Sequence, residues 1–151
     1  MHNAFLEASG LHRQLGFVLR QAYTAVWQDL IRTLEPFGLK PQSYATLLLV
    51  EATPGCKQQD VADALDIQRP NIVALIDKLV EAGWLRRETN ATDRRSYALS
   101  LTEAGQSVLA NSRQAHRDHE SRTAALLGTT TQTDALLAAC TQLVKLPGKD
   151  V

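Results

Sequence analysis

Apolar residues recur at intervals of three and four along most of the chain, a spacing that predicts a protein built mainly of α-helices. The clearest stripe lies within residues 68–81, where its members would face a core while polar residues occupy the other faces. The stripe comprises Ile72, Leu75, Ile76, Leu79 and Val80. A shorter amphipathic helix is expected over residues 57–65, with a tight turn at Asp66 and Ile67. Two helices joined in this way predict a helix-turn-helix unit.

After Gly83, expected to end the second helix in a left-handed conformation, the spacing changes from helical to alternating. Residues 85–88 and 95–101 are predicted to be two strands, and the polar segment 89–94 is predicted to form the tip between them. The stretch from residue 56 to 105 therefore predicts a helix-turn-helix followed by a charged β-hairpin, or wing.

Further helices are expected on both sides of this stretch. Residues 11–34 are predicted to form one long helix after a loose arm or a poorly ordered helix start at 1–10, and residues 42–51 a shorter one. Beyond the hairpin, helices are predicted from a cap at Thr102 to about residue 127 and over 132–146. The apolar surface of the first long helix is too wide for one packed face, which favours contact with a second copy of the chain. The expected fold class is therefore mostly α with a small β-hairpin wing (α+β).

The composition fits one domain, since 151 residues with 44% hydrophobic content can bury a core. A run of about 18 apolar residues is absent, so no membrane span or membrane partner is expected, and no secretory signal is visible at Met1. Cys56 and Cys140 lie far apart and are expected to be free thiols of a cytoplasmic protein.

Charge alone does not favour a nucleic-acid partner, because 16 Lys and Arg residues balance 16 Asp and Glu residues. The placement of donors favours it more. Arg69 and Asn71, near the start of the second helix of the unit, have the side chains that bridge guanine and adenine edges in the major groove. Gln68 and Ala74 are weaker candidates for base contacts. Solvated residues at a helix start are the alternative interpretation.

Three segments of the unit resemble the core of the MarR family of bacterial transcriptional regulators. The matching residues are Leu79, Gly83, Leu85 and Arg87, then Asp93, Arg94 and Arg95, then Leu101, Thr102, Glu103, Ala104 and Gly105. The resemblance implies a winged helix-turn-helix with N- and C-terminal dimerisation helices in a single domain, 1–151. Residues 11–35 and 103–147 would form the dimerisation region and 42–101 the DNA-binding lobe.

The resemblance also implies the partners: a second copy of the chain, a pseudo-palindromic operator in double-stranded DNA and a small-molecule effector. The expected DNA contacts are Gln68, Arg69, Pro70, Asn71, Ala74, Lys78, Arg86 and Arg94. Arg94 at the wing tip would enter the minor groove, and Asp93 and Arg95 would hold the wing in shape. Lys78, Arg86 and Arg87 could meet phosphates, although a solvated surface explains these three residues as well.

Lys57, Asp66 and Gln68 depart from the family pattern, where a capping hydroxyl, a glycine and a small residue are usual. These differences bear on helix capping and on the operator sequence.

The resemblance implies a repressor released by a small anionic aromatic compound, phenolic or carboxylate, bound between the dimer helices and the DNA-binding lobe. The candidate pocket residues are His12, Arg13, Gly16, Arg20, Tyr23 and Tyr44. Ordinary interface packing is the alternative for each.

The sequence contains no phosphate-binding loop or hydrolase motif, so neither an enzyme nor a cofactor is expected. Two other functions remain open. One is a sensor of metal, through His116 and His119, or of oxidants, through Cys56 beside Lys57. The other is a helical protein-interaction module that does not bind DNA.

Overall fold

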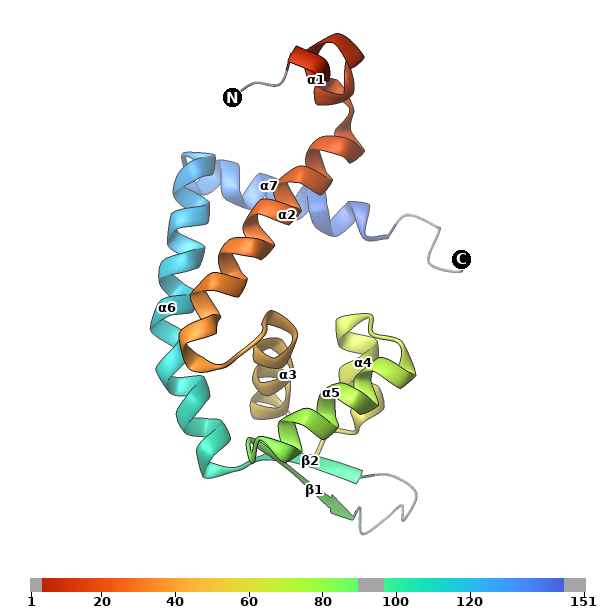
Figure 1. Ribbon diagram of the computed structural model, residues 1–151, viewed down its shortest axis with the longest axis vertical. Coiled ribbons are helices and arrows are strands. Elements are labelled where there is room, and N and C mark those ends of the chain that lie inside the picture. The colour runs from red at the N-terminus through yellow and green to blue at the C-terminus, as the bar shows by residue number, and fades with distance from the viewer. Residues whose placement is uncertain (1–3, 90–96, 146–151) are drawn as a thin grey trace. The chain divides into compact units, whose positions relative to one another are not determined.

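The computed structural model of the protein describes residues 4–89 and 97–145, which form two compact units, 1–116 and 117–151. Helices dominate both units, as the apolar spacing predicts (Figure 1). In chain order the elements are α1 (Ala4–Ser9), the 3-10 turn η1 (Leu11–Arg13), α2 (Leu15–Leu34), the 3-10 turn η2 (Glu35–Phe37), α3 (Pro41–Ala52), α4 (Gln58–Leu65), α5 (Arg69–Glu81), β1 (Leu85–Thr89), β2 (Tyr97–Leu101), α6 (Glu103–Leu127) and α7 (Thr130–Leu143).

The prediction of one continuous helix over residues 11–34 is wrong, and of the two alternatives for residues 1–10 the structure has the helix start and not the loose arm. Ala4–Ser9 is already helical, and Gly10 then breaks the chain direction with a left-handed φ of 71°. Gln14 is extended, so the long helix α2 begins only at Leu15. The extended backbone at Gln14 separates residues 11–13 from α2, and apolar spacing alone does not reveal such a break.

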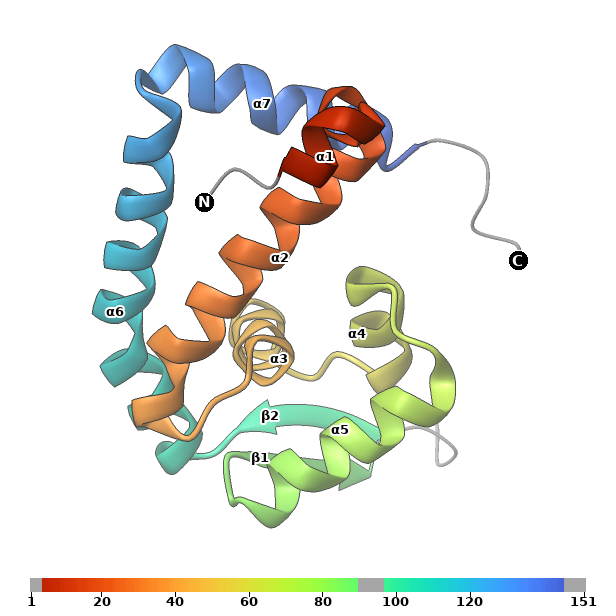
Figure 2. The ribbon, with the colours of Figure 1, turned by 45° about the horizontal axis from the view of Figure 1, so that its top comes forward.

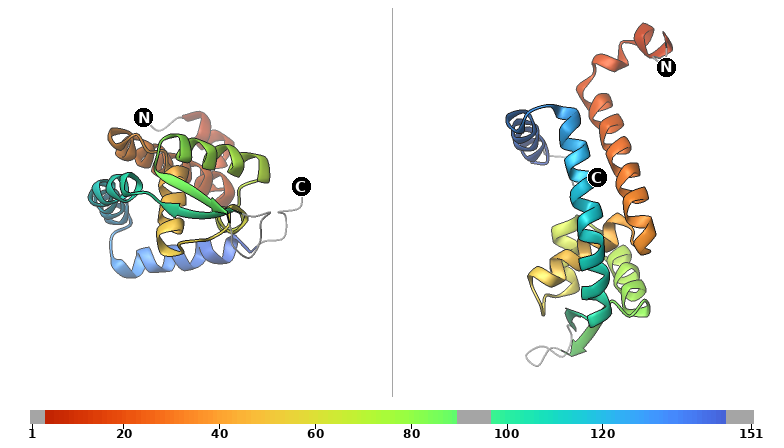
Figure 3. Two further views of the ribbon diagram at one scale, coloured as in Figure 1. Left: turned by 90° about the horizontal axis from the view of Figure 1, so that it is seen from below. Right: turned by 90° about the vertical axis from the view of Figure 1, so that its left-hand side faces the viewer.

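The helix-turn-helix is confirmed. Asp66, between α4 and α5, takes a left-handed φ of 53°, a conformation that Asp tolerates better than most side chains. The stripe on α5 faces inward as predicted, with Ile72, Ile76 and Leu79 fully or almost fully buried. Figure 2 shows α5 lying against the two-stranded hairpin, and Figure 3 (left) shows the same arrangement from below.

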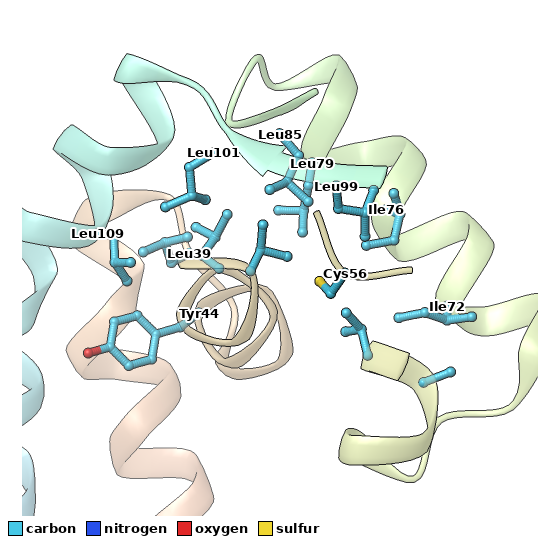
Figure 4. Packing of buried hydrophobic residues seen from close by; sticks show 14 of the residues in the cluster. Leu39, Tyr44, Cys56, Ile72, Ile76, Leu79, Leu85, Leu99, Leu101 and Leu109 are labelled. Carbon is cyan, nitrogen blue, oxygen red and sulfur yellow. The ribbon is translucent and has the colours of Figure 1, made fainter. Parts of the chain in front are cut away.

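The hairpin pairs β1 and β2 antiparallel, with Leu85 opposite Leu101 and Arg87 opposite Leu99. The extended residues before α4 add a short third segment to this sheet, because Leu99 N–H donates to the Cys56 carbonyl at 2.9 Å. Leu85, Leu99 and Leu101 point into the core shared with α3, α5 and the first turns of α6 (Figure 4). The wing is therefore fixed at its base to both helices of the helix-turn-helix.

The predicted cap at Thr102 is confirmed, and it brings α6 very close to the end of α5. The Thr102 hydroxyl accepts from the Gly105 N–H at 3.0 Å and donates to the Gly83 carbonyl at 2.5 Å. A Cβ placed on Gly105 would lie 2.1 Å from the Trp84 carbonyl oxygen. Glycine at this position is thus required by the approach of two backbones.

The second unit contains the last turns of α6 and all of α7. Thr129 caps α7 by accepting from the Gln132 N–H at 3.3 Å, while the Gln132 side chain accepts from the Thr129 N–H at 2.8 Å. Leu126, Leu137 and Val144 are more than 60% exposed, so this unit carries apolar surface that its own residues leave uncovered. Within the described residues, no helix is long and apolar enough to cross a membrane.

Candidate nucleic-acid interface

The first turn of α5 presents its polar side chains to solvent. Gln68 is extended and precedes the helix, and Pro70 stands in the first turn, where its missing N–H removes no helical hydrogen bond. Gln68, Arg69 and Asn71 are exposed, while Ile72 directly behind them is fully buried. The helix start is therefore held by its apolar back and leaves its donors accessible, as a recognition helix requires.

The candidate contact residues on α5 occupy two flanks of the helix. Arg69 lines a hollow that faces α4 and the hairpin. Asn71, Ala74 and Lys78 line a second hollow, on the side of η2 and the start of α3. Asp77 is also exposed and lines the same hollow as Arg69, so this flank of α5 includes a carboxylate as well as a donor.

Ion pairs involve the basic residues of β1. Arg87 Nη1 binds Asp77 Oδ1 at 2.6 Å and so ties β1 to α5, while its side chain is only 25% exposed. Arg86 Nε binds Glu88 Oε1 at 2.8 Å on the solvent side of the strand, an exposed pair of the kind that adds little stability. The predicted wing residues Asp93, Arg94 and Arg95 lie outside the described residues.

An aromatic cavity of about 410 Å³ lies behind this surface, within the first unit. Tyr44 stacks on His116 with ring centroids 4.7 Å apart, and Tyr23 stacks on Trp27 at 5.6 Å. The cavity is lined by Tyr23, Trp27, Leu30, Pro41, Gln42, Tyr44, Ala45, Leu48, Leu65, Ile67 and His116. Its size and mixture of aromatic rings with few polar groups suit a small aromatic ligand.

The structure brings only part of the predicted pocket set together. Tyr23 and Tyr44 both line the cavity. His12 and Arg13 lie in η1, while Gly16 and Arg20 lie on α2, and none of these four residues lines it. Trp27 and His116 do line it and were missed. In the sequence His116 is identifiable only as a possible metal ligand, because it stands three residues from His119 on one helix, whereas Tyr44 is distant along the chain.

The sensor alternatives gain little from the structure. No cluster of three or more potential metal ligands occurs among residues 4–89 and 97–145. Burial, and secondarily the charge of Asp60, raise the pKa of the Cys56 thiol above its ordinary value. A raised pKa reduces the thiolate fraction, which is the reactive form, so the neighbouring Lys57 does not activate this thiol.

Known proteins are similar to this chain in sequence and in architecture. The family model of the MarR family matches residues 37–96. A protein of Thauera aromatica, described as a transcriptional regulatory protein for the hcr operon, is 37% identical over 103 residues, which are 68% of this chain and 62% of that protein. The transcriptional repressor CouR, solved on a 23-mer DNA duplex, has a TM-score of 0.85 and 36% identity over 89% of this chain and 95% of its own. CouR bound to p-coumaroyl-CoA has a TM-score of 0.81 and 33% identity over 89% and 94% of the two chains.

Proposed function

Because the chain belongs to the MarR family of transcriptional regulators, we propose that it is a sequence-specific DNA-binding repressor that a small aromatic effector releases from its operator. The observation that carries the proposal is the recognition helix α5, whose apolar back is buried and whose N-terminal donors are exposed beside a wing. A second support is the similarity to a repressor that was solved on a DNA duplex, because the match covers 95% of that repressor's chain. The protein would act in the cytoplasm, as a binding protein and not as an enzyme.

Contacts with the operator would be of two kinds: contacts with bases, which recognise the sequence, and contacts with phosphates, which position the protein. Asn71 and Arg69 would bond to base edges in the major groove, with Gln68, Pro70 and Ala74 close to the same bases. Lys78 and Arg86 would meet phosphates, which position the protein without reading sequence. Arg94 would reach the minor groove from the wing tip, with Asp93 and Arg95 shaping that tip.

A homodimer would present two such units to the two halves of a pseudo-palindromic site. Uncovered apolar side chains on both terminal regions support this assembly. On α2 they are Leu15, Val18, Tyr23, Val26 and Ile31, and in the second unit Leu126, Leu136, Leu137 and Val144. Burying them between two copies would contribute roughly 25 cal/mol for each Å² removed from water.

The aromatic cavity would hold the effector. Its lining includes neither Lys nor Arg, so a buried carboxylate would find His116 as the one group there able to carry a positive charge. Burying a carboxylate there would cost free energy, because the charge loses its water. An aromatic acyl group joined through a neutral thioester carries no such charge into the cavity. CouR, solved with p-coumaroyl-CoA, binds a ligand of this kind. We therefore narrow the anionic aromatic effector expected from the sequence to an aromatic acyl thioester, whose larger part would extend out of the cavity.

The cavity is connected to the recognition helix through the turn before it. Leu65 and Ile67 line the cavity on either side of the left-handed Asp66, and Ile67 is followed directly by Gln68. Suppose that the turn and the start of α5 have one position that fits DNA and another that does not. A ligand that binds the second position more tightly would shift the equilibrium toward it, by an amount set by the difference between its two affinities. Release from DNA would follow from that preference.

Tryptophan emission tests the effector site, because Trp27 lines the cavity and Trp84, the other tryptophan of the chain, does not. Titration with p-coumaroyl-CoA is expected to quench emission and to release operator DNA, at a concentration at least about tenfold below that needed with free p-coumarate. The Trp84→Phe variant should keep the quenching and Trp27→Phe should lose it. Quenching that survives Trp27→Phe, or that leaves DNA binding unchanged, would contradict the assignment.

A further inference from the structure

Two side-chain contacts join α6 to α3 within the first unit. The guanidinium of Arg113 on α6 donates from Nη2 to the Glu51 carboxylate on α3. The ring of His116 stacks on that of Tyr44, with centroids 4.7 Å apart. Arg113 and His116 stand three residues apart on α6, and Tyr44 and Glu51 stand about two turns apart on α3, so each helix presents both of its residues on one face. The four residues form one line of contact, called the α3–α6 seam below.

The two contacts of the α3–α6 seam differ in their relation to the aromatic cavity. Tyr44 and His116 line the cavity, and Tyr44 is only 5% exposed. Glu51 and Arg113 do not line it, and their side chains are 42% and 37% exposed. The ion pair therefore lies toward solvent from the ring stack, and it can affect a ligand in the cavity only through the two rings.

The ion pair is formed throughout the neutral pH range. The hydrogen bond with Glu51 raises the pKa of Arg113 above its ordinary value, opposed by partial burial and helped by the charges of Glu51 and Tyr44. The guanidinium therefore keeps its charge while it is bound to α3. An exposed pair of this kind adds little to the stability of the fold, so a variant without it should still fold.

The geometry gives this exposed pair a role in the cavity. Stacked rings tolerate a range of offsets, whereas a charged hydrogen bond fixes the direction between its two groups. A binding site that is already in shape costs a ligand less free energy than one that binding must order. On the basis of the proposed function, we propose that Glu51 and Arg113 are positioning residues, which hold the Tyr44 and His116 rings in the arrangement that accepts the aromatic group of the effector.

Reversing the two charges, one at a time and together, tests this role. The concentration of p-coumaroyl-CoA that gives half of the Trp27 quenching is expected to rise about threefold to tenfold in Glu51→Arg and in Arg113→Glu. The double variant, which restores an ion pair with exchanged charges, should return to within about twofold of the wild type. Operator affinity without effector should stay within about twofold in all three variants, because the seam lies away from the exposed donors of α5.

Two further variants complete the set. Glu51→Gln removes a charge and adds none, so it should fall between the wild type and the reversed variants, and it replaces them if reversal prevents folding. Glu103→Gln is the matched control, since it removes an exposed carboxylate at the start of α6, and it should change neither quantity.

The outcomes separate this role from a general effect of charge and from the proposed function. Attraction or repulsion between the seam and the phosphates of CoA would shift the two single variants in opposite directions, and that result would overturn the proposal. Unchanged effector affinity, a double variant that is not rescued, or an equal loss of operator affinity would overturn it too. Absence of quenching in the wild type would instead remove the effector site itself.

Discussion

Replacing Gly105 with Ala is expected to lower the free energy of unfolding by about 3 kcal/mol or more, since overpacking a tight contact costs roughly 1–3 kcal/mol and here the neighbour is backbone. The new Cβ would lie 2.1 Å from the Trp84 carbonyl oxygen, closer than a side chain can come. That carbonyl cannot turn aside freely, because it accepts from the Thr102 N–H at 3.1 Å. The clash would separate α6 from the base of the wing.

Denaturant unfolding measures this effect, and Gly16→Ala is its control. Gly16 lies in α2, and a Cβ there meets nothing within 4 Å. Alanine at that position should leave stability unchanged or raise it slightly, by less than about 1 kcal/mol. Equal stability of the two variants would mean that the start of α6 does not approach the Trp84 backbone as closely as the structure shows.

The second large effect is expected for Asn71→Ala in the recognition helix. One bidentate contact with adenine contributes about 1–3 kcal/mol of discrimination, and a dimer makes it twice, so operator affinity should fall by about 2–6 kcal/mol. Affinity for unrelated duplexes should hardly change, because Asn71 is exposed and carries no charge for phosphate. Titrations of operator and of scrambled duplex with labelled DNA give both numbers.

Asn111→Ala provides a matched control for this prediction, as an exposed asparagine on α6 away from α5. It should behave as the wild type on both duplexes. A loss for Asn71→Ala that is equal on operator and scrambled DNA would show that Asn71 has no part in reading bases.

Local patterns in the sequence were sufficient for the elements whose residues interact nearby in the chain. The stripe at Ile72, Ile76 and Leu79 predicted both the helix and its buried face, and Gly83 marked its end with the left-handed φ observed, 71°. The segment Leu101–Gly105 served as a family signature in the sequence. The structure supplies its physical reason, a threonine cap and a glycine forced by the Trp84 backbone.

Features that depend on distant segments were not predictable in this way. The aromatic cavity joins Tyr23, Tyr44, Ile67 and His116, which belong to different helices or turns and share no spacing rule. The family resemblance implied pocket residues along α2, but only part of that helix faces the cavity. Tyr23 therefore lines the cavity, and Gly16 and Arg20 do not.

The electrostatics of the DNA-binding surface gave a similar lesson. A count of charges between α5 and the wing shows a small positive excess and says nothing of pairing. The structure shows that Arg87 Nη1 binds the Asp77 carboxylate, an ion pair that a count of charges cannot reveal. Lys57 looked in the sequence only like a poor helix cap, since its relation to β1 and β2 arises from the fold.

Selection of duplexes from a random library by the purified protein tests the central claim most directly. We expect enrichment of an inverted repeat whose half-site centres lie about one helical turn apart, or a multiple of that, bound with an affinity that falls steeply with salt and is lost on addition of p-coumaroyl-CoA. A library without any enriched repeat, or binding that is insensitive to salt, would contradict the account of this chain as a dimeric operator-binding repressor.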